Sequence, residues 1–253
     1  MSAEASHHYD NAFYRYITEG SLRSARLLIP ALCDALGYMP PTVLDVGCGA
    51  GAWLAAWKER GAVVFGVDGV HVSPQSLLIE PAEFLPHDLR ASLDLGRRFS
   101  LIQCLEVAEH LPGSAASELL ESICRHGDVV MFSAAPPGQG GEFHVNERPY
   151  GWWQARFAAS GFRMYDPLRA ELLSDPRILP WYRYNTFVFV REGAQRDIHE
   201  RLARFLVAPE SSPLDLAPLL YRLRRRAIAV LPVAVVTRVA ILKKHLFNLL
   251  GRS

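Results

Sequence analysis

The chain has 253 residues and a net charge of +1, with 50% hydrophobic and 21% charged residues. These values indicate an ordinary globular protein with one sizeable core and room for an appendage. The four cysteines, at positions 33, 48, 104 and 124, form no Cys-x-x-Cys pair, which argues against a disulfide framework and a cysteine zinc site. The N-terminal residues lack the basic start and apolar core of a secretory signal, so we expect free thiols and a cytoplasmic location.

Charge is distributed unevenly along the chain. From Arg196 onward there are 11 Lys/Arg and 4 Asp/Glu, whereas the preceding residues contain 16 and 22. A mildly acidic body therefore carries a basic tail, which suggests separate modules. We expect a helical lead-in at 1–40, a cofactor-binding domain at 41–192 and a basic helical tail at 193–253.

The first predicted element is a helix within residues 9–36, with Ser21 as a candidate N-cap. Gly37 and the pair Pro40-Pro41 end this segment. Four aromatic residues near its start are candidates to cover a cofactor pocket or to pack on the sheet: Tyr9, Phe13, Tyr14 and Tyr16.

The stretch from Val43 to Trp53 organises the rest of the chain. An apolar run ends in Asp45 and three alternating glycines, and a helical pattern follows. This order predicts a buried strand, a tight turn and a helix N-terminus, where backbone N–H groups favour an anionic group.

Two ligand classes fit such a turn. Gly47, Gly49 and Ala52 satisfy a dinucleotide fingerprint loosely. Asp45 favours a different ligand, because a carboxylate at the strand end suits a cationic, amine-bearing group better than a pyrophosphate. A tight turn without any ligand is the remaining alternative.

The next strand supplies a second acid. A helix at 52–60 stops at Gly61, and a strand at 63–68 ends in Asp68, 23 residues after Asp45. A carboxylate in this place accepts hydrogen bonds from two ribose hydroxyls in nucleotide-binding βαβ units. Residues 70–86 read as irregular. Asp88 then either contacts a nucleobase or caps a helix at 89–97.

The remaining elements alternate between strands and helices. We expect strands at 100–105, 129–134, 162–165 and 186–190, helices at 114–125 and 149–160, and an insertion at 167–184 on the substrate side. The alternation predicts an α/β fold with a doubly wound, mostly parallel sheet and a C-terminal helical extension. Ligands of such sheets lie beyond the carboxyl ends of the strands.

The glycine stretch resembles motif I of the class I S-adenosylmethionine-dependent methyltransferases, and the resemblance covers residues 10–192. It implies that the predicted α/β sheet is seven-stranded and Rossmann-like. It also implies that Asp45 and the turn hold the methionine end of S-adenosylmethionine, Asp68 the ribose, and Asp88 with Leu89 the adenine. The predicted cofactor site comprises Asp45, Gly47, Cys48, Gly49, Gly51, Trp53, Asp68, Gly69, Asp88, Leu89 and Leu105.

Glu106, Glu109 and His110 are spaced i, i+3, i+4 and share one face of a helical turn. Two carboxylates and an imidazole suit a divalent cation such as Mg²⁺, Mn²⁺ or Zn²⁺, with His144 as a fourth ligand. The Glu-x-x-Glu-His segment is similar to that of small-RNA 2′-O-methyltransferases and ubiquinone-pathway O-methyltransferases, which implies a metal beside the acceptor hydroxyl. Alternatively, these residues cap or pair within the fold.

His144 is the candidate general base with or without a metal, and Glu106 faces the acceptor. We therefore expect O-methylation of a polar small molecule or a sugar or glycan hydroxyl. An NAD-dependent oxidoreductase and a non-catalytic cofactor-binding scaffold are the alternatives. Four residues of the helix at 149–160 and its approach either line the acceptor site or seat that helix: Asn146, Tyr150, Trp152 and Trp153. Glu147 is a fifth candidate of the same kind.

The tail at 214–250 reads as two amphipathic helices broken at Pro232. A stripe of Val235, Val239, Leu242, Leu246 and Leu249 recurs at helical spacing. Its longest apolar run is too short to span a bilayer. Peripheral contact with the inner face of a membrane and a homodimer interface are the two main predictions, a solvated helix packed on the body is the remaining alternative, and no clear nucleic-acid motif is present.

Overall fold

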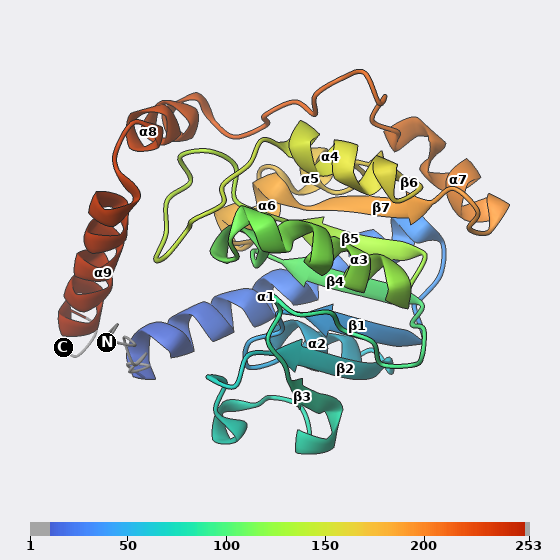
Figure 1. Ribbon diagram of the computed structural model, residues 1–253, viewed down its shortest axis with the longest axis horizontal. Helices are drawn as coiled ribbons and strands as arrows, with labels where there is room; N and C mark the ends of the chain where they lie inside the picture. The colour runs from blue at the N-terminus through green and yellow to red at the C-terminus, as the bar shows by residue number, and fades with distance from the viewer. Residues whose placement is uncertain (1–10, 251–253) are drawn as a thin grey trace.

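The computed structural model describes residues 11–250, with side chains placed for 17–243, 245 and 246. Within this part of the chain seven strands form one sheet in the order β3-β2-β1-β4-β5-β7-β6 (Figure 1). β7 is antiparallel to β5 and β6, and the other pairings are parallel. The strands are β1 (Thr42–Val46), β2 (Val63–Asp68), β3 (Phe84–Pro86), β4 (Leu101–Leu105), β5 (Val129–Ser133), β6 (Phe162–Tyr165) and β7 (Phe187–Arg191). The predicted fold class is confirmed.

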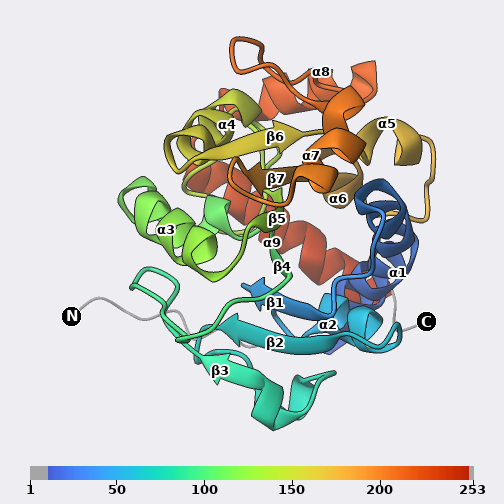
Figure 2. The same ribbon diagram turned by 90° about the vertical axis from the view of Figure 1, so that its right-hand side faces the viewer.

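Helices cover both faces of the sheet (Figure 2). α1 (Asn11–Leu36), α2 (Ala52–Lys58) and α7 (Arg196–Leu202) lie on one face. α3 (Ala116–His126) and α4 (Tyr150–Ala159) lie on the other. Two short helices, α5 (Arg169–Leu172) and α6 (Pro180–Asn185), occupy the predicted insertion between β6 and β7.

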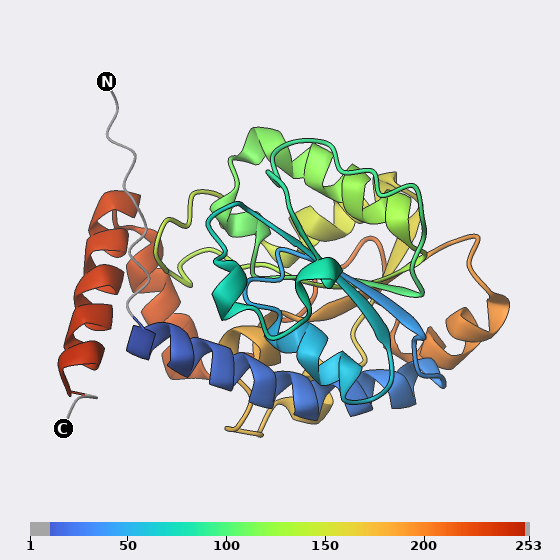
Figure 3. The same cartoon turned by 90° about the horizontal axis from the view of Figure 1, so that it is seen from below.

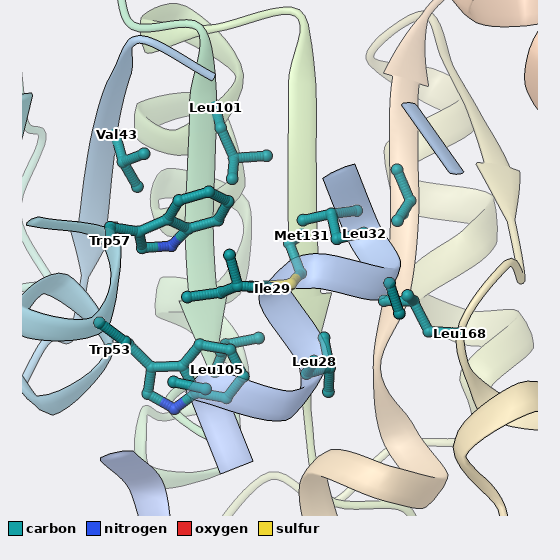
Figure 4. Packing of buried hydrophobic residues seen from close by; sticks show 14 of the residues in the cluster. Leu28, Ile29, Leu32, Val43, Trp53, Trp57, Leu101, Leu105, Met131 and Leu168 are labelled. Carbon is teal, nitrogen blue, oxygen red and sulfur yellow. The ribbon is translucent and has the colours of Figure 1, made fainter. Parts of the chain in front are cut away.

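The core on the α1 side explains how the long first helix is held. Leu28, Ile29 and Leu32 project from α1 toward Leu101 and Met131 of the sheet, and all five are fully or almost fully buried (Figure 4). Their i, i+1, i+4 spacing is that of one helical face. This face fixes α1 along the sheet, with Trp57 of α2 beside it.

Two local predictions were wrong. Ser21 is not an N-cap, because α1 runs unbroken through it and the Ser21 hydroxyl instead hydrogen-bonds that of Tyr182 at 3.1 Å. No helix forms at 89–97, where the chain makes a turn and an extended segment. The short strand β3 precedes it, in a region predicted to be irregular, because β2 offers a parallel edge and Gly66 pairs with Phe84.

The C-terminal tail consists of α8 (Leu219–Ala229) and α9 (Val233–Leu250). The two helices stand beside the sheet, with α9 close to the beginning of α1 (Figures 1 and 3). α8 packs on the loop after β5 so closely that a Cβ at Gly138 would overlap the backbone carbonyl oxygen of Arg225. Among the described residues, no helix has the length and apolar character needed to cross a bilayer.

Arg169 ties the insertion to the start of the tail. Its guanidinium is almost fully buried, donates to both carboxylate oxygens of Asp166 at 3.0 and 2.7 Å, and donates to the carbonyl oxygens of Tyr184 and Leu214 at 3.0 Å. The buried charge depends on Asp166, because a buried ion left without its counter-ion is strongly destabilising.

We expect Asp166→Asn to lower the free energy of unfolding by about 3 kcal/mol, because it removes the countercharge and retains the shape. Urea denaturation measures the change. The control is Glu200→Gln in the exposed pair of Arg196 and Glu200, 2.7 Å apart, which should change stability by less than about 0.5 kcal/mol. Equal effects of the two substitutions would contradict this account of Arg169.

Candidate active site

The candidate site lies at the carboxyl edge of the sheet, where the direction of winding reverses. From β1 the chain proceeds outward through β2 to β3 and then returns to β4 on the other side of β1. This reversal opens a crevice beyond the strand ends, which is where ligands of doubly wound sheets bind. Asp45, Asp68 and Glu106 lie at the ends of β1, β2 and β4, as predicted.

The turn after β1 requires glycine for two separate reasons. Gly47 and Gly51 have φ of 87° and 81°, in the left-handed region that favours glycine. A Cβ at Gly47 would also overlap the side chain of Val107, which follows β4. The turn is anchored by the N–H groups of Gly47 and Cys48, which donate to the Val67 carbonyl oxygen at 2.7 and 3.2 Å. The backbone is thereby held close to the crevice.

Asp45 is 3% exposed and is held by a buried relay. Gln103 donates to its Oδ2 at 2.6 Å, and Trp57 Nε1 donates to Gln103 Oε1 at 2.9 Å. Burial raises the pKa of Asp45 to about 8, with the charge of Asp68 adding to the rise and the Gln103 hydrogen bond opposing it. Sequence reasoning missed Gln103. The available signal was its polarity within β4, where its four neighbours are apolar.

Asp68 binds the glycine turn directly. Its Oδ2 accepts the N–H of Gly49 and its Oδ1 accepts the N–H of Gly69, both at 2.6 Å. His71 Nε2 lies 3.6 Å from Oδ1. A carboxylate has about four lone-pair positions, so two backbone bonds leave capacity for further donors. The carboxylate is thus fixed in place and is still able to accept hydrogen bonds from a ligand.

The other predicted cofactor residues surround these two acids to different degrees. Cys48, Trp53 and Leu105 are buried at this edge, and Leu89 is partly buried. Asp88 is exposed and bound by Arg90, whose guanidinium lowers the pKa of Asp88 to about 2. Because no helix follows, Asp88 is not a helix N-cap; the N–H of Arg90 instead donates to its Oδ1 at 3.0 Å and stabilises the turn there.

Glu106 occupies a strained position directly after β4. Its φ is 56°, which is uncommon for a residue other than glycine. Gln139 Nε2 donates to Oε2 at 2.6 Å, and Asn185 Nδ2 donates to Oε1 at 3.2 Å. Burial raises the pKa of Glu106, partly offset by these hydrogen bonds. Gln139 and Asn185, which also bond each other at 2.7 Å, were not predicted.

Three of the four predicted metal ligands come together. One ligating atom from each of Glu109, His110 and His144 lies within 4.8 Å of the other two. Glu109 is fully buried, and within the described residues neither of its carboxylate oxygens has a hydrogen-bond partner. Burial, followed by the charge of Glu106, raises the pKa of Glu109 well above its usual range. Glu106 itself is not part of this group.

The loop at 136–147 carries His144 to this cluster. The carbonyl oxygen of Glu109 accepts the N–H groups of Val145 and Asn146 at 2.8 and 3.0 Å, and the rings of His110 and His144 are 4.7 Å apart. His144 Nδ1 lies 2.9 Å from Glu147 Oε1. Glu147 also accepts the N–H groups of Gly138 and Gly140 at 2.7 and 2.8 Å. Burial acts to raise the pKa of Glu147, but the bonds from His144 and both glycines outweigh it and lower that pKa.

A hollow of about 250 Å³ opens beside His144, between this loop and the tail. Its polar side includes His144 and Glu147. The tail contributes only apolar residues to the walls: Ile228, Ala229, Leu231, Val233 and Val236. The C-terminal tail therefore forms part of the wall of the hollow beside His144, which the sequence did not indicate.

The neighbouring candidates mostly seat α4. Trp153 is buried against Phe132 at 5.1 Å, and the face of Trp152 is covered by the guanidinium of Arg156. Asn146 donates to the Ala108 carbonyl oxygen at 3.3 Å. Tyr150 differs, because its hydroxyl donates to Asn185 at 2.9 Å and so supports the residues around Glu106. The aromatic candidates Tyr9, Phe13, Tyr14 and Tyr16 lie outside the residues whose side chains the structure describes.

The pKa of Asp45 predicts a pH-dependent stability. The folded protein keeps a proton on Asp45 up to about pH 8, whereas an ordinary Asp, with a pKa of 3.8, releases it near pH 4. The free energy of unfolding should therefore fall as pH rises from about 4 to about 8 and then level off. Asp45→Asn should reduce this slope and raise the melting temperature at pH 8 by several degrees. Asp34→Asn, at an exposed position, is the control, and an unchanged slope in Asp45→Asn would contradict the assignment.

Comparison with known proteins places this site in a family. A family model described as a methyltransferase domain matches residues 15–169, which is more than half of the chain. The O-methyltransferase of ubiquinone biosynthesis from Pasteurella multocida (strain Pm70) is 30% identical over 119 residues, which cover 40% of this chain and 48% of that protein. The corresponding enzyme from Histophilus somni (strain 2336) is 30% identical over 112 residues, or 40% and 47%. The chain thus matches about half the length of these curated relatives.

Solved structures agree on the fold. Magnesium protoporphyrin IX methyltransferase (ChlM) from Synechocystis PCC 6803 with bound S-adenosylmethionine superposes with a TM-score of 0.51 at 20% identity, covering 72% of this chain and 85% of that one. The sugar N-methyltransferase KedS8 from Streptoalloteichus sp ATCC 53650 gives a TM-score of 0.55 at 18% identity, covering 76% and 98%. The chain therefore belongs to the methyltransferase domain family, and its resemblance to the class I S-adenosylmethionine-dependent methyltransferases is confirmed.

Proposed function

We propose that this protein transfers the methyl group of S-adenosylmethionine to a hydroxyl oxygen of a polar small molecule, sugar or glycan. The observation that carries the proposal is the arrangement of Asp45 and Asp68 on either side of a glycine turn, with His144 across the same edge of the sheet. Family membership supports the reaction class. The solved ChlM structure contains S-adenosylmethionine on a similar fold.

The cofactor's charges explain the donor side. Asp45 would lie near the methionine end, where the ammonium and sulfonium groups are cationic and favour its charged form. Asp68 would accept the two ribose hydroxyls with the lone pairs that Gly49 and Gly69 leave available. Asp88 and Leu89 would contact the adenine. In-line attack then requires mainly that donor and acceptor be held in alignment.

NAD is the weaker ligand for the same turn. A pyrophosphate would bring negative charge toward the buried Asp45, whose raised pKa already reflects the absence of a compensating cation among the described residues, whereas a sulfonium and an ammonium would favour the charged form of this carboxyl. A non-catalytic scaffold is the third alternative. The pairing of His144 with Glu147 disfavours it, since a binding scaffold has no use for an oriented base.

His144 is the proposed general base. With Nδ1–H donating to Glu147, the other ring nitrogen, Nε2, has a free lone pair and can take the proton of an acceptor hydroxyl. Glu147 thereby sets the tautomer and also stabilises the imidazolium that forms. Glu106, held by Gln139 and Asn185, would position the acceptor through its carboxylate.

A divalent cation is an alternative means of activating the same oxygen. Glu109, His110 and His144 lie close enough together to hold such an ion. The carboxylate of Glu109 is buried without a hydrogen-bond partner among the described residues, and its pKa is raised because no positive charge compensates its burial. A bound cation would supply a Lewis acid that lowers the pKa of the acceptor hydroxyl. Glu109 and the two histidines would hold it.

The first test compares cofactor classes. We expect S-adenosylhomocysteine at 100 times its Kd to stabilise the protein by about 2.7 kcal/mol, and NAD at the same concentration to produce no shift in melting temperature. Asp68→Ala should abolish the shift, because it removes the acceptor of the ribose hydroxyls. Asp94→Ala, which removes an exposed Asp bonded to the Gly96 N–H, is the matched control. A shift with NAD alone would favour the oxidoreductase.

The second test concerns the metal. Titration calorimetry with Mn²⁺ should show binding to the wild-type protein that Glu109→Gln weakens at least tenfold, since a neutral amide is a poor ligand for a hard cation. Glu121→Gln on the exposed face of α3 should bind as the wild type does. If methyl transfer to the acceptor continues unchanged after complete chelation, the metal has no role and His144 acts as base alone.

A further inference from the structure

The two tail helices and the residues between them, 219–250, form what we call the tail hairpin. Ten of its leucine and valine side chains are 42% to 81% exposed. They are Leu219, Leu220, Leu223, Val230, Leu231, Val233, Val235, Val239, Leu242 and Leu246. So many exposed apolar side chains on one small element point to an interaction surface.

The tail hairpin is anchored to the rest of the protein through α8. α8 is fixed to the body by the close packing at Gly138, by Arg224 Nη1 donating to the Gln139 carbonyl oxygen at 3.2 Å, and by the ion pair of Arg225 with Asp215 at 2.7 Å. α8 is therefore fixed to the body, while the ten leucine and valine side chains of the hairpin remain exposed.

The positive charge of the tail hairpin favours an anionic partner. Residues 219–250 contain seven Arg and Lys residues and no Asp or Glu. Arg226, Arg238 and Lys243 are exposed in the structure. On α9 the exposed Val235, Val239, Leu242 and Leu246 form one stripe, and a period of about 3.6 residues per turn puts Arg238 and Lys243 on opposite sides of it. An apolar stripe flanked by basic residues is the pattern of a helix lying in a membrane interface.

A second copy of the chain fits this surface less well. A twofold symmetric contact would bring the same basic helices together, and no acidic residue of the hairpin is present to compensate. Anionic lipid headgroups supply the missing negative charge, and the acyl region supplies an environment for the leucines and valines.

We propose that the tail hairpin docks this protein on an anionic lipid bilayer, lying in the plane of the interface. Leu231 and Val233, at the turn between the two helices, are exposed and also line the hollow beside His144. Docking therefore brings that hollow to the lipid boundary. The docking itself does not depend on the proposed methyl transfer.

Co-flotation of the full-length protein with vesicles tests this proposal. We expect binding to vesicles of phosphatidylcholine with 30% phosphatidylglycerol, and at least tenfold weaker binding to phosphatidylcholine alone. Arg226→Glu/Arg238→Glu/Lys243→Glu and Leu220→Ser/Val230→Ser/Leu246→Ser should each weaken binding at least tenfold. Arg60→Glu/Arg196→Glu/Arg204→Glu, which changes three exposed arginines outside the tail hairpin by the same charge, should weaken it less than threefold. Circular dichroism and melting temperature check that every variant is folded.

The outcomes separate the alternatives. Absence of binding to anionic vesicles, or equal loss with the body variant, would overturn the proposal. Light scattering that shows a dimer which the leucine and valine substitutions dissociate would assign the surface to a second copy instead. Failure of S-adenosylhomocysteine to bind would affect only the proposed methyl transfer, since vesicle binding is measured without cofactor.

Discussion

The hydrogen bond from Gln103 to Asp45 is the contact on which the site depends. It joins β1 to β4 at the point where the order of strands reverses, and residues 45 and 103 are register partners there. Because Trp57 of α2 holds Gln103 in turn, the helix after the glycine turn, both central strands and the carboxylate form one unit. The turn can therefore remain open toward the crevice without losing its position.

The acids at this edge are held in surroundings that oppose their charge. Burial raises the pKa of Asp45, Glu106 and Glu109. A fold selected for stability alone would replace such groups, since uncompensated buried carboxyls are costly. Their presence here is explained if cations occupy the edge: a sulfonium and an ammonium near Asp45, and a metal ion near Glu109. Two backbone N–H groups satisfy part of the carboxylate of Asp68, the fourth acid at this edge.

The sequence pattern predicted those strands and turns that are determined by neighbouring residues in the chain. The apolar runs of β1, β2, β4 and β5 and the glycines that follow β1 each carry their own signal. Gln103, Gln139 and Asn185 carried none that was recognised, because their partners lie 58, 33 and 79 positions away and only the assembled sheet brings them together. The i, i+3, i+4 spacing of Glu106, Glu109 and His110 was also insufficient to predict which of these side chains lie together. Glu106 adopts a positive φ, leaves the helical face and turns to Gln139 and Asn185.

The contact between Gly138 and the Arg225 carbonyl has a consequence for how such enzymes can be recombined. The loop at 136–147 orients His144 through Glu147, and α8 covers this loop. At Gly138 the two segments meet backbone to backbone, so no side chain there can adjust to a different partner. If the tail were grafted onto a related methyltransferase, it would not pack in the same position unless the loop at 136–147 were transferred with it. The loop and the tail therefore form one structural unit. A chimera that takes them from different proteins should misplace the imidazole of His144 even when every catalytic residue is kept.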